Sequence, residues 1–460
     1  MILVDTLPDD VLLAIFDCCV AQREEAWQPL VHVCRRWRSI IFASPRHLKL
    51  QLVCTELTPT RDMLDVWPAL PLVFQSPVFG GTGRTDNVIA VLERSDRVCQ
   101  INLDYVSSSD MEIYLAAMQH PFPELTDLSL YSYGTTVPVV PDSFLGGSAP
   151  RVRNLTLVHI PFPGLPKLLL SATQLARLSL HQIPHSGYIS PEAMVTALST
   201  LTSLEYLTLT FLSPRSCPDQ ASQRPPPSTR PVIPILKKFQ FEGVAEYLEG
   251  LAACIDAPRL DELFITFFND IEFNTPQIMQ FISRTLARRS RAFRKGNIIL
   301  KDCDATLYIS NDITLGVKII CRGLEWQVSS LGQVCTSSLP PLSNLEDLYI
   351  YDLPHLQPDW KDDIENGLWL QLLRPFTAVK DLYISEQFAL LIGPALQELA
   401  EGGTTEVLPD LQNIFLERLE SSGSVQEGMG KFVAARQVAG RPIAVSSWVN
   451  SDWDKRDYYL

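Results

Sequence analysis

A three-point apolar spacing recurs along most of the chain. One apolar residue is followed three positions later by a second, and two positions after that by a third, as in Leu125, Leu128 and Leu130. Because side chains alternate along a β-strand, the spacing predicts strands that bury these anchor residues and turn the residues between them to the other face. The pattern starts at Val98, Leu125, Val152, Leu175, Leu204, Leu236, Leu260, Leu345, Val379 and Leu411.

Helical stretches separate the predicted strands. Ser190-Pro191-Glu192 precedes an apolar stretch at 194–201, and Thr275-Pro276 precedes another at 278–286. A hydroxyl side chain at the cap and a proline at the first helical position both favour helix initiation. Each unit therefore consists of a strand and then a helix.

The spacing between units is typical of leucine-rich repeats, although it is uneven. Starts are 23 residues apart between Val152 and Leu175 and 34 apart between Leu345 and Val379, at or above the usual ~20–29. One unit cannot cover its own apolar edge, so neighbouring units stack. We predict an α/β fold, an irregular leucine-rich-repeat-like solenoid with a parallel sheet on its concave face and helices outside.

The turn after each strand lacks the asparagine that many leucine-rich repeats use to bond the turn backbone. No asparagine ladder can form, so side-chain packing must hold the turns and the curve should be less regular. The corresponding residues are Tyr133, Ile160, Ile183, Leu212, Val244, Phe268, Leu353, Gln387 and Leu419.

The repeats should occupy residues 97–420, between a connector at 51–96 and a C-terminal cap at 421–460. The cap consists of a helix at 425–438 and a strand at Ile443-Ala444-Val445. Residues 213–231 are rich in proline, serine and glutamine, which predicts a disordered loop. The segment 291–325 contains three closely spaced apolar runs, which fit either antiparallel strands or repeats without helices.

Residues 1–50 form a separate helical module in this prediction. Pro8 suits the first helical position, and Asp9 and Asp10 place negative charge at the positive end of the helix dipole. A segment of this length has little interior, so part of its apolar surface must be covered by another chain or by the rest of this one. The apolar residues recur at helical spacing: Val11, Leu12, Ile15 and Phe16, then Leu30, Val33, Trp37 and Ile41.

These residues resemble an F-box. The resemblance rests on Leu7-Pro8, Ile15-Phe16 and Val33-Cys34-Arg35-Arg36-Trp37-Arg38. It extends along nearly the whole chain to the expanded F-box family of basidiomycete (agaricomycete) fungi, through Trp-Pro-Ala-Leu-Pro-Leu at 67–72, Trp-Gln-Val-Ser-Ser-Leu at 326–331, Leu-Glu-Asp-Leu-Tyr-Ile at 345–350 and Phe-Val-Ala-Ala-Arg-Gln at 432–437.

The resemblance implies a three-helix module that docks on the adaptor subunit of an SCF (adaptor, cullin, F-box) ubiquitin ligase, and repeats that bind a protein substrate. The alternative is a ligase-independent repeat scaffold or recognition receptor whose N-terminal helices only cap the array. Under the first hypothesis the adaptor contacts are Leu7, Pro8, Leu12, Ile15, Phe16, Leu30, Val33 and Trp37.

The composition of the chain excludes some classes of binding partner. The chain has 38 Lys+Arg against 52 Asp+Glu, a net charge of -14 that repels phosphate backbones, so we expect no nucleic-acid partner. The 10 cysteines include no Cys-x-x-Cys pair and are expected to be reduced. No apolar run approaches the ~20 residues that span a bilayer, so we expect no membrane partner and a cytoplasmic or nuclear location.

Catalytic signatures are missing from the sequence. No nucleophile elbow, phosphate-binding glycine loop or dinucleotide fingerprint occurs, and the histidines do not gather with Cys or Asp at metal-ligand spacing. His181 and His185 are four residues apart, but Pro184 lies between them. We expect a non-catalytic ligase subunit with no cofactor and no metal.

Two charged or aromatic groups are candidates for partner binding. A basic cluster could dock an acidic partner, although a solvated helix end explains it more simply; it comprises Arg284, Arg288, Arg289, Arg291, Arg294 and Lys295. The second group lies between the strand anchors, where early repeats carry small polar residues and later repeats carry rings and carboxylates.

The later rings and carboxylates should align into one stripe on the concave face. Such a surface suits a protein substrate with a basic segment, because rings desolvate a large area and carboxylates select cations. The alternative is that the rings meet an insertion or a neighbouring loop. The candidates are Glu262, Phe264, Asp347, Tyr349, Tyr351, Asp381, Tyr383, Phe415 and Glu417, with Asn413 beside them.

Overall fold

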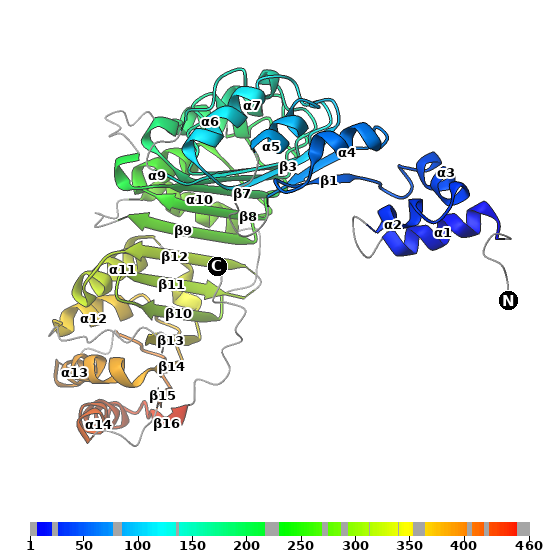
Figure 1. Ribbon diagram of the computed structural model, residues 1–460. Coiled ribbons are helices and arrows are strands. Elements are labelled where there is room, and N and C mark those ends of the chain that lie inside the picture. The colour runs from blue at the N-terminus through cyan, green and yellow to red at the C-terminus, as the bar shows by residue number, and fades with distance from the viewer. Residues whose placement is uncertain are drawn as a thin grey trace. The chain divides into compact units, whose positions relative to one another are not determined.

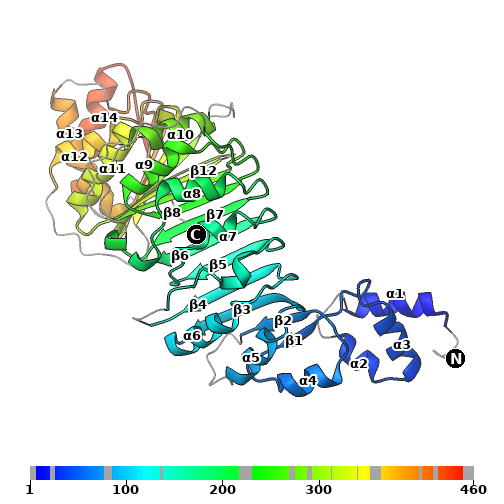
Figure 2. The same ribbon diagram turned by 90° about the horizontal axis from the view of Figure 1, so that it is seen from above.

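The strands form a mostly parallel sheet with alternating helices, as Figures 1 and 2 show, which confirms the predicted α/β repeat fold. Contacts divide the chain into unit 1 (Met1–Ile189 with Thr196–Tyr206) and unit 2 (Ser190–Val195 with Leu207–Leu460). The computed structural model describes residues 7–20, 26–76, 85–134, 138–216, 230–268, 275–286, 293–311, 313–338, 340–352, 364–402, 407–417 and 423–448.

Unit 1 begins with the helices α1 (Asp9–Val20), α2 (Trp27–Val31) and α3 (Arg35–Ala43). Pro8 lies just before α1, and its carbonyl accepts the first helical bond from the Leu12 N–H at 3.0 Å. At the start of α3 the Cys34 Sγ accepts the backbone N–H of Trp37 at 3.5 Å. Helix α1 therefore begins at Asp9, one residue after the proline that predicted its start.

The repeats of unit 1 follow these helices. Anchor residues of neighbouring strands are aligned and buried, as in the register Leu128, Leu155 and Leu178. All neighbouring strands from β1 to β6 pair in parallel. The elements are β1 (Leu52–Cys54), α4 (Thr60–Val66), β2 (Leu72–Gln75), α5 (Thr85–Leu92), β3 (Val98–Val106), α6 (Ser108–Ala117), β4 (Asp127–Ser132), η2 (Phe144–Gly147), β5 (Asn154–Val158), α7 (Leu165–Leu169), β6 (Arg177–Ile183) and η3 (His185–Gly187).

The strand–helix pattern starts earlier than the anchor spacing indicates. Residues 51–96, expected as an irregular connector, contain β1, α4, β2 and α5. β2 pairs in parallel with β1 and with β3, so repeating units begin at Leu52. β1 and β2 are 3 and 4 residues long, too short to display the full three-point spacing.

Left-handed residues occur at the C-terminal ends of several strands in unit 1: Tyr105 and Gln182 are the second-last residues of β3 and β6, and His159 directly follows β5. Tyr105, His159 and Gln182 have φ of 53°, 59° and 51°, a region that non-glycine residues adopt at a cost of about 1–3 kcal/mol. All three occupy the eighth position of their repeats, one before the place where asparagine is missing. Backbone bonds secure the turns, for example from the His159 N–H to the His181 carbonyl at 2.9 Å.

Unit 2 continues the repeats, and α8 and β7 contain residues of both units. Its elements are α8 (Pro191–Leu198), β7 (Tyr206–Phe211), η4 (Pro214–Ser216), β8 (Lys238–Gly243), α9 (Ala245–Cys254), β9 (Glu262–Phe268), α10 (Pro276–Leu286), β10 (Lys295–Leu300), β11 (Asp304–Ser310), β12 (Thr314–Ile320), α11 (Leu324–Ser338), η5 (Pro340–Asn344), β13 (Asp347–Asp352), α12 (Asn366–Leu373), β14 (Asp381–Ile384), α13 (Glu386–Gly402), β15 (Asn413–Glu417), α14 (Gly423–Val438) and β16 (Ala444–Trp448).

The segment 291–325 forms antiparallel strands within the sheet, which decides between the two predicted alternatives. The strand order is β9-β12-β11-β10-β13, so the chain passes over two positions before β10 and then returns (Figure 1). β11 is antiparallel to both its neighbours, whereas β12 is parallel to β9 and β10 is parallel to β13. The insertion therefore presents parallel strands to the repeats on both sides.

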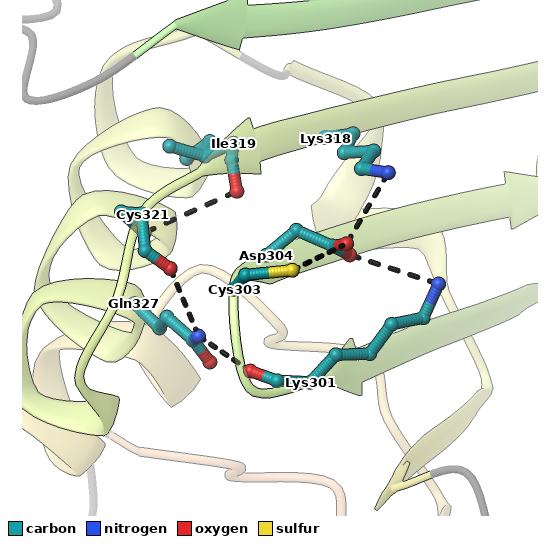
Figure 3. Close-up of polar contacts among 7 residues, drawn as sticks. All are labelled: Lys301, Cys303, Asp304, Lys318, Ile319, Cys321 and Gln327. Carbon is teal, nitrogen blue, oxygen red and sulfur yellow. Dashed lines mark hydrogen bonds and ion pairs between the residues drawn. The ribbon is translucent and has the colours of Figure 1, made fainter. Parts of the chain in front are cut away.

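A buried glutamine fastens this insertion to the helix that follows it (Figure 3). Gln327 of α11 is fully buried, and its Nε2 donates to the carbonyls of Lys301 at 2.6 Å and Cys321 at 3.1 Å. Beside it, Asp304 lies between Lys318 Nζ at 3.2 Å and Lys301 Nζ at 3.7 Å. These contacts hold the ends of β10 and β12 against α11.

The C-terminal elements agree with the sequence. α14 and β16 cover the predicted helix at 425–438 and the predicted final strand, and β16 pairs in parallel with β15. Residues 217–229 of the predicted proline-rich loop lie outside the described residues, and so do 449–460 of the predicted cap. The described part of the proline-rich stretch contains η4 (Pro214–Ser216).

Candidate protein-binding sites

The N-terminal helices bury part of the surface predicted to contact an adaptor. Leu12 and Phe16 are fully buried, and the Phe16 ring packs 4.8 Å from the Trp37 ring between centroids. Both residues fill the interior between α1 and α3, so the expectation that they contact a partner is wrong. The apolar spacing marked the buried side of α1, because an amphipathic helix turns its most regular face to its own core.

A second apolar face of the same helices remains exposed. Ile15 is 43% exposed, Val33 is 59% exposed and Pro8 is exposed. Val11, which the predicted contact set lacked, is 40% exposed. The other predicted contacts, Leu7, Leu30 and Trp37, are half-buried.

An arginine of α3 holds the residues at the start of α1 by hydrogen bonds. Arg36 of α3 donates from Nη2 to the Leu7 carbonyl at 2.6 Å, and from Nε to Asp9 Oδ1 at 3.0 Å. The Arg38 Nε donates to the Val31 carbonyl at 3.0 Å. Arg36 therefore links α3 to the start of α1, and Arg38 links it to the end of α2.

The helices also pack against the chain that follows them within unit 1. Trp27 is fully buried, its ring lies 5.2 Å from that of Trp67, and its Nε1 donates to the Gln51 carbonyl at 3.1 Å. His32 and Phe42 also meet the Trp67 ring. The module thus covers the start of the first repeat as well as exposing an apolar face.

The sheet of unit 2 stacks the predicted rings along one row of its open face, the face that carries the residues between the anchors. Tyr349, Tyr383 and Phe415 are in register on β13, β14 and β15. The centroids of neighbouring rings are 4.2 Å and 4.5 Å apart. The ring planes of each pair are nearly parallel, with an angle of 9° between them, so the rings are stacked. All three are half-buried, so the row presents ring edges to solvent.

Trp448 completes this aromatic group, and sequence reasoning missed it. Its ring meets Tyr349 and Tyr383 edge-on at centroid distances of 6.1 Å and 5.6 Å, and its Nε1 donates to the Ile384 carbonyl at 3.2 Å. Trp448 ends β16, and no repeat spacing predicts that its side chain reaches β14. We call Tyr349, Tyr383, Phe415 and Trp448 the aromatic row.

A row of carboxylates lies next to the aromatic row. Asp347, Asp381 and Asn413 are directly opposite one another on the same three strands, and Asn413 Nδ2 donates to Asp381 Oδ1 at 2.7 Å. Burial, and then the neighbouring Asp381, raise the pKa of Asp347 above its ordinary value. Burial also raises the pKa of Tyr349 and Tyr383, and both carboxylates act in the same direction.

The predicted single stripe is divided in two. Glu262 and Phe264 lie on β9, and β12, β11 and β10 separate them from β13. Phe264 instead stacks near Tyr308 across Gly316, with a centroid distance of 6.4 Å. Phe264 and Tyr349 still occupy one register row, through Gly316, Tyr308 and Asn297, but the three strands of the insertion place them apart.

Two further predicted residues have different surroundings. Tyr351 is only 2% exposed, so it is a buried residue of β13 and not part of an accessible site. Glu417 is half-buried at the end of β15, in register with Trp448. The accessible part of the predicted site thus consists of the aromatic row with Asp347 and Asp381.

The basic cluster is largely committed to internal contacts where the structure describes it. Arg284 donates from Nε to Asp256 Oδ1 at 2.7 Å, and Arg294 pairs with Glu346 at 3.0 Å. Arg288, Arg289 and Arg291 lie outside the described residues. These contacts favour the structural explanation for Arg284 and Arg294.

The open face of unit 1 carries polar ladders and an exposed tyrosine group. Asp127 accepts hydrogen bonds from the side chains of Thr126, Asn154 and Gln100. Tyr105 is 61% exposed and lies 4.6 Å from the Tyr131 ring between centroids. Sequence reasoning did not single out these tyrosines, because Tyr105 precedes a turn whose left-handed backbone is visible only in the structure.

Comparisons with known proteins find structural similarity but no matching family model. No protein-family model matches the chain, and no curated protein matches it. Among solved structures, a crystal structure of the leucine-rich repeat-containing protein LegL7 from Legionella pneumophila is similar over 83% of this chain and 97% of that chain, with 10% identity and a TM-score of 0.27. The fold assignment therefore rests on the strands and helices described above.

Among the helices that the structure describes, none combines the length and the apolar character needed to cross a bilayer.

Proposed function

We propose that this protein is the substrate-recognition subunit of an SCF-type ubiquitin ligase. The observation that carries the proposal is the exposure of four apolar residues, Pro8, Val11, Ile15 and Val33, in a small helical module that resembles an F-box. Apolar residues gathered on a small helical module favour a protein partner. The adaptor subunit, and through it the cullin, would cover these residues.

In this role the chain supplies proximity and orientation and no bond chemistry of its own. The repeats would hold a protein substrate near the ubiquitin-charged enzyme of the complex. We place the substrate on the open face of unit 2, at the aromatic row and the adjacent carboxylates. Half-buried aromatic rings of this kind are common anchors of protein interfaces.

A pull-down of the full chain with a purified fungal SCF adaptor tests the first half of the proposal. The variant Ile15→Asp with Val33→Asp places two charges on the exposed face and should weaken adaptor binding by about tenfold or more, because each charge would lose water in the interface. Val66→Asp is the matched control, since Val66 is exposed on α4 of the same unit. Equal retention of adaptor by all three proteins would refute the assignment of this surface.

The second candidate function is a ligase-independent repeat receptor whose N-terminal helices cap the array. The packing of Trp27 against Trp67 and the bond to Gln51 favour it, because terminal repeats need a cover. Under this hypothesis the wild-type chain retains no adaptor, and a chain that lacks residues 1–50 aggregates. Under the first hypothesis the wild-type chain retains adaptor whatever the shortened chain does.

A further inference from the structure

Two carboxylates lie side by side on the open face of unit 2. Asp347 and Asp381 are directly opposite on the parallel strands β13 and β14, and both are half-buried. Like charges in this position destabilise a sheet. The raised pKa of Asp347 reflects burial and then the neighbouring Asp381.

Two cations act on one member of this pair: Arg294 and Lys295 lower the pKa of Asp347, although burial and Asp381 raise it by more. In the same row, Lys295 of β10 is opposite Asp347, whereas Asp381 has Asp347 on one side and Asn413 on the other. Arg294 and Lys380 both pair with Glu346, at 3.0 Å and 3.1 Å. The row thus contains two carboxylates and one lysine.

An equivalent position in the same unit shows how such a group is satisfied. On β9, Glu262 and Phe264 occupy the same repeat positions as Asp381 and Tyr383. Lys238 of β8 pairs with Glu262 at 3.0 Å and lies 5.1 Å from the centre of the Phe264 ring. The chain therefore fills the carboxylate-and-ring site of β9 with its own cation.

At β14 the sheet provides carboxylates and rings, and between β10 and β15 the described residues of this row include no cation besides Lys295. The side chains of Tyr349 and Tyr383 stack beside Asp347 and Asp381, and Trp448 meets both rings edge-on. A planar cation with several N–H donors could bond both carboxylates at once. Guanidinium meets these requirements better than ammonium, because it has five donors in one plane and is weakly hydrated.

We propose that Asp347, Asp381 and the aromatic row bind an arginine side chain of the protein substrate. This inference rests on the proposed function, since it specifies what the substrate site recognises. The partner is a protein segment, and its arginine supplies the cation that Lys238 supplies to Glu262 at β9. At β14 the strand position equivalent to Lys238 is occupied by Asp347, so the arginine would come from outside the sheet.

The test is selection of random twelve-residue peptides displayed on phage against the immobilised full chain. Wild-type protein should enrich arginine at one position of the selected peptides. In a selected peptide, replacing that arginine with glutamine should weaken binding by about tenfold or more, and replacing it with lysine should weaken it less.

The matching protein variant is Asp347→Asn with Asp381→Asn, which keeps side-chain size and removes the like charges. It should bind the selected peptide about tenfold more weakly or worse. Asp104→Asn, a half-buried carboxylate on the open face of unit 1, should leave the affinity unchanged. No arginine enrichment, or equal binding by the double variant, would overturn the inference.

Adaptor pull-downs with the same proteins separate this inference from the proposed function. The double variant should retain adaptor as the wild type does, because its substitutions lie in unit 2. Loss of arginine selection with intact adaptor binding defeats only the arginine site. Arginine selection without adaptor binding in the wild type defeats the ligase role and leaves the site standing.

Discussion

The open faces of the two units use one repeat position in opposite ways. In unit 1 this position holds Asp127, whose carboxylate is bonded by Gln100, Thr126 and Asn154. In unit 2 it holds Asp381, which accepts from Asn413 but faces Asp347 on its other side. The first carboxylate is satisfied by its own sheet, whereas the second carries a repulsion that its own sheet does not remove.

The next position on the same face of each strand, two residues further along the chain, shows the same contrast. In unit 1 it carries Ser129 and Thr156, and in unit 2 it carries Tyr349 and Tyr383. Stacked rings on neighbouring strands stabilise a sheet, whereas like charges directly opposite one another destabilise it. Asp127 on the open face of unit 1 is bonded within the sheet, and our proposal assigns the rings and carboxylates on the open face of unit 2 to a partner.

The largest effect expected concerns the rings. Tyr349→Ala with Tyr383→Ala should abolish detectable binding of a peptide selected on the wild type, since truncating one central interface ring commonly costs on the order of 2 kcal/mol. Ser129→Ala with Thr156→Ala changes the same repeat position in unit 1 and should leave binding intact. Titration of a labelled peptide measures both affinities. Equal losses in the two variants would remove the functional difference between the faces.

The next effect is on stability. Asp127→Ala leaves the Gln100 and Asn154 amides without this acceptor, while the Thr126 hydroxyl keeps the Cys99 carbonyl, and it should lower the free energy of unfolding by about 2 kcal/mol. Asp381→Ala should lower the free energy of unfolding by less. It leaves only the Asn413 side chain without its acceptor, and it removes the repulsion with Asp347. Urea denaturation followed by circular dichroism compares the variants. A larger loss for Asp381→Ala would reverse the comparison.

A smaller effect of opposite sign is expected at Asp347. Asp347→Asn removes one of two facing carboxylates and should raise the free energy of unfolding by roughly 0.2–1 kcal/mol at neutral pH. Thermal unfolding of the variant beside the wild type is the measurement. A lower Tm for the variant would show that the carboxylate pair is stabilised within the chain.

The smallest effect is a pH dependence. The pKa of Asp347 is raised in the folded chain, first by burial and then by Asp381, so the folded state binds this proton more tightly than the unfolded state does. Relative to Asp347→Asn, wild-type stability should therefore rise as pH falls through the raised pKa toward the ordinary aspartate value near ~3.9. Denaturation at several pH values checks the sign, and a relative fall on acidification would contradict it.

The positions of most strands and the helical start signals were available from the sequence, because both depend on local periodicity. Anchors such as Leu128 and Leu155 alternate with exposed residues within one strand, and Pro8 acts on its own helix. The alignment of Tyr349 with Tyr383 and Phe415 was also predictable, since equal repeat positions come into register when parallel units stack.

Tertiary structure alone decided which apolar residues of the first helices stay accessible. Leu12 and Phe16 share helical spacing with Ile15, but only contact with α3 shows that the first two are interior and the third is exposed. Spacing reports that a helix has an apolar side. It does not report how much of that side its neighbours cover.

Tertiary structure also decided the strand order of the insertion and the place of Trp448. The apolar runs of β10, β11 and β12 predict strands, but pairing between segments distant in the chain determines that β12 lies next to β9. That order separates Phe264 from Tyr349, while Trp448 reaches Tyr383 from the end of another strand. Local periodicity determined where most helices and strands form, and long-range pairing determined which of their residues meet.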